Sequence, residues 1–159
     1  MLKVRTERAN SKEFHAISQE LSVAEIRSVE VQQFIDDLLE TAETTITQEG
    51  YKTVGLAAVQ VGQPVRLLVA KNLHSGKFFA YLNPKLELLG EATDLHTESC
   101  LSIPGVITEV SRHKRIRLSF FDRYGNQKAE KFDGFEARII QHEYDHLEGI
   151  LFTERARTA

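Results

Sequence analysis

The segment DGFEARIIQHEYDHLEG, residues 133–149, constrains the fold of this 159-residue chain more than any other. Its apolar positions recur with partial helical spacing, at Phe135, Ile139, Ile140 and Leu147. This pattern predicts an amphipathic helix that packs one side against a core. Asp133 precedes Glu136 by three residues, which is the spacing of a capping box with aspartate in the usual Ser or Thr position, and Gly149 is suited to end the helix.

Two histidines of this helix predict a metal site. His142 and His146 are four residues apart, so they present both imidazoles on one face. Imidazole suits zinc and other late first-row divalent metals, including iron. Glu143 is then well placed as a general base toward water. HExxH is a short pattern that also occurs by chance, so the alternative is a helix with two surface histidines. The apolar neighbours Ile139 and Leu147 favour the metal site.

A catalytic site of this kind usually has three protein ligands, and the third is expected upstream. Phe152 occupies the position at which a longer HExxH motif would place another histidine. Only thirteen residues follow His146, which is too few for a ligand on a following helix. Besides many carboxylates, the upstream candidates are His15, His74, His96, His113 and Cys100. Thiolate is a strong ligand and a Cys/His/His set leaves one position open for water, yet spacing alone does not exclude the others.

Charge and composition narrow the class of protein. The net charge is −3 and the pI about 6.1, which argues against nucleic acid as a direct partner. No apolar run approaches the roughly 20 residues of a membrane helix, so we expect no membrane partner. The single cysteine cannot form an internal disulfide, which favours a reducing cytoplasm. Without repeats or linkers, residues 1–159 are expected to form one domain.

The remaining pattern predicts an α+β fold. Residues 1–27 indicate an irregular or short-stranded lead-in. Helical spacing follows from Val31, with Ser28 as N-cap and an end near Gly50. Residues 55–70 suggest a strand or loop, a turn and a strand. Further strands are expected at residues 78–82, 85–89, 107–110, 116–121 and 128–132, with Asn83-Pro84 as a break and Tyr124-Gly125-Asn126 in a hairpin turn. Mostly antiparallel sheets should therefore pack around the HExxH helix, with a second, N-terminal helix.

Three motifs in this order resemble those of the peptide deformylases. GLAAVQ at residues 55–60 is similar to the GxGxAAxQ of that family, and ESCLS at residues 98–102 is similar to EGCLS. QHEYDHLEG at residues 141–149 is similar to QHExDHLxG. The resemblance covers roughly residues 28–152, and three motifs at matching spacing are far more specific than one HExxH.

The resemblance implies a metal-dependent amide hydrolase. Peptide deformylases remove the N-formyl group from the formyl-methionine of new polypeptides and release formate. Carried over, the metal ligands are Cys100, His142 and His146, with one position left for water. Fe(II) is expected, and zinc or nickel serves in some members, because the ligand set does not choose between them. Glu143 would be the general base, while the Gln60 amide and the Leu101 backbone N–H would stabilise the oxyanion.

The resemblance also implies how a formyl-methionyl peptide binds. An extended peptide would add a strand beside the backbone near Val54, Gly55 and Ser99. Phe135 and Ile139, with the aliphatic stem of Arg138, could wall an apolar pocket for the methionine side chain. Plain core packing is the alternative role for each of these side chains.

Two positions depart from the family pattern. Thr53 and Ser99 stand where the family has glycines, and Ser99 adds a side chain beside the metal cysteine. A different N-acyl peptide as substrate, or a weakly active or non-catalytic relative, therefore remains as an alternative. Only TERARTA follows Phe152, so any transient ribosome contact is not expected to use the C-terminal helix of many bacterial members. We expect a bacterial-type cytoplasmic protein, with an organelle as the alternative.

Overall fold

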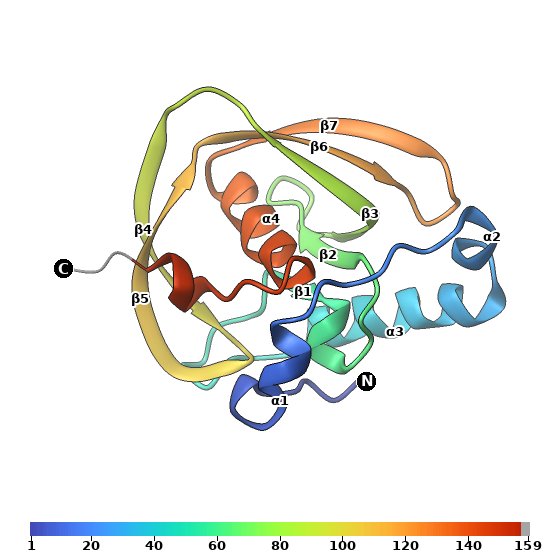
Figure 1. Cartoon of the computed structure of the whole chain (residues 1–159), viewed down its shortest axis with the longest axis horizontal. Coiled ribbons are helices and arrows are strands. Elements are labelled where there is room, and N and C mark those ends of the chain that lie inside the picture. Colours follow the sequence, from blue (N-terminus) through green and yellow to red (C-terminus); the bar gives the residue numbers. More distant parts are fainter. Residues whose placement is uncertain (157–159) are drawn as a thin grey trace.

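The computed structural model describes residues 1–156, in which two antiparallel sheets surround one helix, α4 (Gly134–Leu147) (Figure 1). The larger sheet has the order β1-β2-β3-β6-β7. Its strands are β1 (Gly55–Ala57), β2 (Leu67–Lys71), β3 (Phe78–Leu88), β6 (Arg115–Phe121) and β7 (Gln127–Asp133). The smaller sheet pairs β4 (Thr93–Cys100) with β5 (Ile103–His113). The predicted α+β class, with antiparallel sheets around the HExxH helix, is confirmed.

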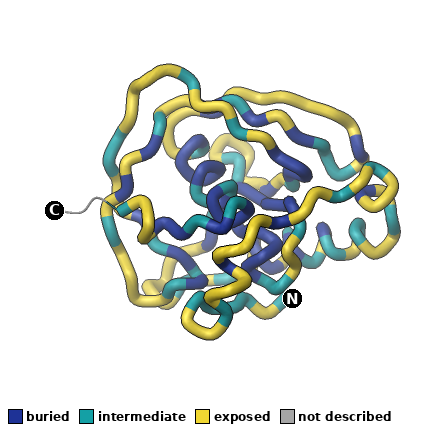
Figure 2. The backbone as a smooth tube through the Cα atoms, viewed as in Figure 1, coloured by how far each residue is buried: buried dark blue, intermediate teal, exposed yellow. Residues whose placement is uncertain are grey.

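Helix α4 is buried between the sheets because its apolar residues join the main core. Ile139, Ile140 and Leu147 pack with residues of β2 and β6, including Leu68 and Leu118. Figure 2 shows this centre as buried, while much of the β4–β5 pair is exposed. The HExxH side chains are therefore held on a rigid element with little access to water.

The predicted capping box at the start of α4 is wrong. Asp133 precedes the helix but makes no side-chain hydrogen bond to it. Gly134 has a φ of +57°, so the backbone turns between Asp133 and the helix and carries this side chain away from the first amides. Glu136 instead accepts a hydrogen bond from the backbone N–H of Leu73, at 2.7 Å. The helix therefore begins without the reciprocal cap that the spacing suggested.

Helix α3 (Val29–Thr44) packs on the larger sheet through a second core cluster. Ser28 is the N-cap, as predicted, and its hydroxyl accepts from the N–H of Val31 at 3.3 Å. The predicted end near Gly50 is wrong, because the helix stops at Thr44. The β-branched run from Thr44 to Thr47 disfavours helix, and residues 45–52 form a loop closed by a bridge between Ile46 and Lys52.

The N-terminal segment is helical where an irregular or short-stranded lead-in was predicted, so that prediction is wrong. Helix α1 (Glu7–Phe14) and the short α2 (Val23–Ile26) both form. The polar sequence of α1 has no apolar stripe, and Phe14 is its one buried residue. The Phe14 ring meets His146 edge-on with ring centroids 6.1 Å apart. This contact with His146 at the end of α4 therefore stabilises α1, whose own sequence did not indicate a helix.

Two details of the sheets also differ from the prediction. The segments 78–82 and 85–89 belong to one strand, β3, whose register shifts between Leu82 and Lys85. Asn83 there has a φ of +46° and its side chain binds the backbone of Leu21, so the break is a bulge rather than an end. The β4 strand was not predicted, because its sequence TDLHTESC is mostly polar. No helix among the described residues has the length and apolar character needed to span a membrane.

Candidate metal centre and active site

Cys100, His142 and His146 converge on one point. One possible ligand atom from each of them lies within 4.8 Å of the other two. Cys100 ends β4, where the pairing with β5 shifts between Glu98 and Cys100, and this irregularity allows the thiol to face α4. The Sγ atom lies 3.4 Å from His146 Nε2. Within residues 1–156, none of the other upstream histidines joins this group.

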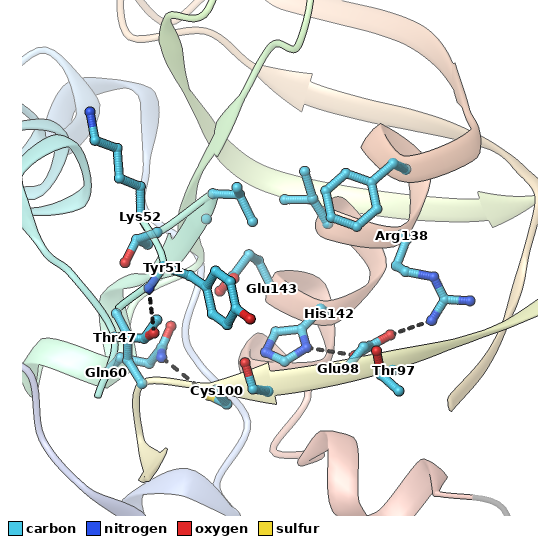
Figure 3. Close-up of a pocket in the computed structure, with 17 residues that line it drawn as sticks. Thr47, Tyr51, Lys52, Gln60, Thr97, Glu98, Cys100, Arg138, His142 and Glu143 are labelled. Atoms are coloured by element: carbon cyan, nitrogen blue, oxygen red, sulfur yellow. Dashed lines mark hydrogen bonds and ion pairs between the residues drawn. The ribbon is translucent and has the colours of Figure 1, made fainter. Parts of the chain in front are cut away.

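The donor set fits a late first-row divalent cation. His142 donates through Nδ1 to Glu98 Oε1 at 2.8 Å (Figure 3), so Nε2 is the ring nitrogen available to Cys100 and the centre. Burial alone would lower the pKa of His142, but its hydrogen bonds with Cys100 and Glu98 raise it to about 10. The negatively charged groups around the ring therefore favour a positive charge here, and a divalent cation bound to the neutral imidazole can take the place of the proton. A thiolate with two imidazoles is a common zinc set and also suits iron.

A buried network of charges holds Glu98 in place. Arg112 donates to both Glu98 oxygens at 2.6 and 2.9 Å, and to Asp145 Oδ2 at 2.9 Å. Arg138 donates to Glu98 Oε2 at 2.6 Å, and Arg155 pairs with Asp145. Burial alone would raise the pKa of Glu98, but the bonds from Arg112 and His142 keep it well below its ordinary range. Glu98 therefore stays a carboxylate that orients His142.

No role for this network was predicted from the sequence. Arg112 drew no attention, and Arg138 was considered only for its aliphatic stem. Glu98 lies in ESCLS and Asp145 lies in QHEYDHLEG, so both motifs contained charged residues whose partners could have been sought. The sequence signal for such a network is a carboxylate one or two residues from a metal ligand.

Glu143 lies beside the three converging side chains and is 5% exposed. Its Oε2 atom has no hydrogen-bond partner among the described residues. Burial raises the pKa of Glu143 to about 7, although nearby His142 opposes the shift. A carboxylate in this environment can both accept and return a proton near neutral pH.

The side-chain amide of Gln60 also lies at the centre. It lies on a 3₁₀ turn, η1 (Ala58–Val61), directly after β1. Its Oε1 atom accepts from the N–H of Ala57 at 2.8 Å, which orients the amide. Its Nε2 atom donates to Ser102 Oγ at 3.1 Å and lies 3.6 Å from Cys100 Sγ (Figure 3). The amide therefore offers N–H groups next to the converging side chains.

The side chains of Gln60, Cys100, His142 and Glu143 line a cavity of about 390 Å³. Every residue predicted for the site lines it except His146, namely Val54, Gly55, Gln60, Ser99, Cys100, Leu101, Phe135, Ile139, His142 and Glu143. Phe135 is half exposed, whereas Ile139 is buried. Thr53 also lines the cavity and is buried, with an Oγ1 atom that lacks a hydrogen-bond partner among residues 1–156. Glu98 and Arg138 line the cavity too, and Thr47, Tyr51, Lys52 and Thr97 line it without having been anticipated.

Two strand edges border the cavity. Within the described residues β1 pairs with β2 on one side, and β4 pairs with β5 on one side. Residues next to or within these strands, Val54, Gly55 and Ser99, line the cavity. An extended peptide between the two edges could bond to backbone groups on both sides.

The family model for polypeptide deformylases matches residues 7–159. The chain belongs to the peptide deformylase family. A peptide deformylase of Fusobacterium nucleatum is 40% identical over 139 residues, covering 87% of this chain and 75% of the relative. One from Rhodopseudomonas palustris is 42% identical over 132 residues, covering 80% and 72%.

Solved structures agree with this family membership. The crystal structure of peptide deformylase from Thermotoga maritima has a TM-score of 0.86 at 28% identity and covers 99% of each chain. A probable peptide deformylase from Synechococcus phage S-SSM7 has a TM-score of 0.80 at 34% identity, covering 98% of this chain and 99% of the phage chain. The chain is accordingly a metal-dependent deformylase, a hydrolase that removes the N-formyl group from nascent peptides. Nothing in these comparisons favours another N-acyl substrate or a non-catalytic role.

Proposed function

We propose that this deformylase holds one divalent ion through Cys100, His142 and His146. The observation that carries the proposal is the buried convergence of these three side chains beside Glu143. A divalent ion at this point supplies a Lewis acid for the formyl carbonyl and lowers the pKa of water. Glu98 and its arginines support the site because they fix the ring of His142.

We propose that Glu143 moves the protons of the reaction. It takes a proton from the attacking water, whose oxygen bonds to the formyl carbon. It then returns a proton to the amine nitrogen as the C–N bond breaks, which yields formate and a free N-terminus. The buried, unpartnered carboxylate oxygen supports this role, because no protein group competes for it among the described residues.

The negative charge that develops on the formyl oxygen needs hydrogen-bond donors that are already in place. Gln60 Nε2 and the backbone N–H of Leu101 are the donors we propose. The bond from Ala57 to Gln60 Oε1 supports the assignment, since it turns the amide N–H groups toward the centre. The formyl-methionyl peptide would lie extended along Val54, Gly55 and Ser99. Its methionine side chain would lie against Phe135 and Ile139.

We also propose the native ion, the compartment and the partner of this protein. We expect Fe(II) as the native ion, with zinc or nickel able to replace it, because the Cys/His/His set accepts all three. A reducing cytoplasm suits a chain whose single cysteine must remain a thiolate ligand. We propose that residues 1–159 act as one domain and contact the ribosome only transiently.

Substrate choice is tested by formate release from formyl-Met-Ala-Ser and by release of acetate from the acetyl analogue. The chain, purified without oxygen and loaded with iron, should release formate readily and acetate far more slowly. A wall that includes the extra side chains of Thr53 and Ser99 leaves less room for the additional methyl group. Preference for the acetyl peptide would contradict the proposed substrate, and no release from either peptide would contradict the activity.

The ligand assignment is tested by metal content. Replacing Cys100 with alanine should reduce the bound ion from about one per chain to a small fraction, because two imidazoles alone bind weakly. His113→Ala is the matched control, since His113 lies outside the converging group and should leave the ion in place. Metal analysis of both anaerobically purified proteins decides the point and identifies the ion. Full metal content in Cys100→Ala would refute the assignment.

A further inference from the structure

We propose that Gly55 is a positioning residue for Glu143: the missing side chain at residue 55 makes the space in which the carboxylate stands. This inference rests on the proposed role of Glu143 as the proton carrier. A Cβ atom built on Gly55 would lie 2.7 Å from Glu143 Oε1, 2.8 Å from Cγ and 3.0 Å from Cδ. Real Cβ atoms essentially never approach other atoms below 3.0 Å. The Glu143 side chain therefore lies against the bare backbone of β1.

Backbone conformation does not explain this glycine. Eight of the nine glycines in the chain have a positive φ, which by itself favours glycine. Gly55 is the exception, since its φ lies outside this region and it sits in β1 opposite Ala70. An alanine could adopt the same strand conformation without strain. What residue 55 requires is space, and Glu143 occupies that space.

The carboxylate is the part that would move if a methyl group were added. The backbone beside Gly55 is held by β2, where Lys71 donates to the Val54 carbonyl at 2.9 Å. Helix α4 is held by its buried apolar residues. Glu143 Oε2, in contrast, has no hydrogen bond among residues 1–156 that would resist displacement. The Glu143 side chain from Cγ outward would therefore have to rotate to another rotamer, while the backbone of β1 and α4 stays in place, and proton transfer would be lost.

Gly55→Ala should consequently lower kcat while KM, metal content and folding stay close to those of the parent protein. A misplacement of about 1 Å can cost on the order of 100-fold in rate, so we expect a loss of roughly this size in kcat. Gly76→Ala is the control for kcat: a Cβ at Gly76 meets nothing within 4 Å, and the backbone strain from its φ of +71° would affect stability rather than the site. It should leave kcat unchanged.

Because Gly55 also borders the peptide, its methyl group could instead obstruct the substrate. A double-mutant cycle with Glu143→Ala separates the two causes, because alanine lacks Cγ, Cδ and Oε1, the three atoms that a Cβ at residue 55 would meet. If Gly55 acts through Glu143, Gly55→Ala should change the residual kcat by less than about 3-fold in the Glu143→Ala background. An equal loss in both backgrounds, or a rise in KM with kcat unchanged, would overturn the proposal.

A crystal structure of Gly55→Ala gives a readout that does not depend on activity. The Glu143 side chain should occupy a different rotamer from that in the parent protein, with the three metal-site side chains in place. An unmoved carboxylate would overturn the positioning role even if the parent protein released no formate. Should Gly55→Ala fail to fold, restored folding in Gly55→Ala/Glu143→Ala would support the contact, and continued misfolding would count against it.

Discussion

Replacement of Glu143 with alanine is expected to lower kcat for formyl-Met-Ala-Ser by about 10²–10⁴-fold, the usual contribution of a positioned general acid–base group. Glu143 is not one of the three converging side chains, so metal content should remain near that of the parent protein. Glu143→Gln should be nearly as slow, because it keeps the shape of the side chain but cannot accept a proton at the same atom. Formate release and metal analysis on the same preparations measure both quantities.

Glu130→Ala is the matched control for this experiment. Glu130 is an exposed residue of β7 that does not line the cavity, so its loss should leave kcat unchanged. If Glu143→Ala retained full turnover, the proton-carrier assignment would be wrong. If it lost the metal, Glu143 would be acting in metal binding, and the fall in rate could not be assigned to proton transfer.

The elements predicted correctly are those in which apolar residues recur with helical spacing and are also buried in the structure. The HExxH helix and the helix after Ser28 both carry apolar residues toward a core, and both form. Helix α1 could not be predicted in this way, because Phe14 alone anchors it and its partner His146 is distant in sequence. The end of α3 was placed too late because threonines continue past Thr44, where β-branching favours the loop that follows.

For the site, motifs carried more information than spacing. From residue types alone, ligand chemistry favoured Cys100 among several possible third ligands, and the resemblance to deformylases then selected it. The structure brings it to the histidines because β4 changes register just before it, and the polar sequence of β4 did not indicate a strand at all. Gly55 shows a second limit: the motif contained the glycine, but the side chain that needs its space comes from α4.

The charge network around Glu98 could not be predicted from the sequence, for a different reason. Its members come from β4, β5, α4 and the 3₁₀ turn η2 (Phe152–Arg155), and the buried ones would each be poor candidates for burial when considered alone. Only the folded arrangement shows that Arg112 lies between Glu98 and Asp145. Arg112 thus joins the carboxylates of Glu98 and Asp145 in one network, and Glu98 accepts a hydrogen bond from His142.

Arg112 is therefore the member of this network whose loss should affect stability most. Replacing it with methionine removes the bidentate partner of Glu98 and one partner of Asp145, while both carboxylates stay buried. Breaking a buried pair in this way costs about 3–5 kcal/mol, because charge remains without compensation. Arg138 and Arg155 keep part of the network, which places the expected loss at the lower end. Urea unfolding of the metal-free proteins measures the difference in free energy of unfolding without a contribution from metal binding.

The exposed pair of Arg117 with Glu87 supplies the matched comparison. Their side chains are 41% and 61% exposed, so Arg117→Met should change the free energy of unfolding by about 0–1 kcal/mol. Arg112→Met should also weaken metal binding by roughly 10–100-fold, because Glu98 would no longer be fixed against His142 Nδ1. Arg117→Met should leave metal affinity unchanged. If both variants unfolded at the same urea concentration and bound metal equally well, the network would be incidental, and the orientation of His142 would have to come from packing against its neighbours, such as the Phe152 ring stacked beside it.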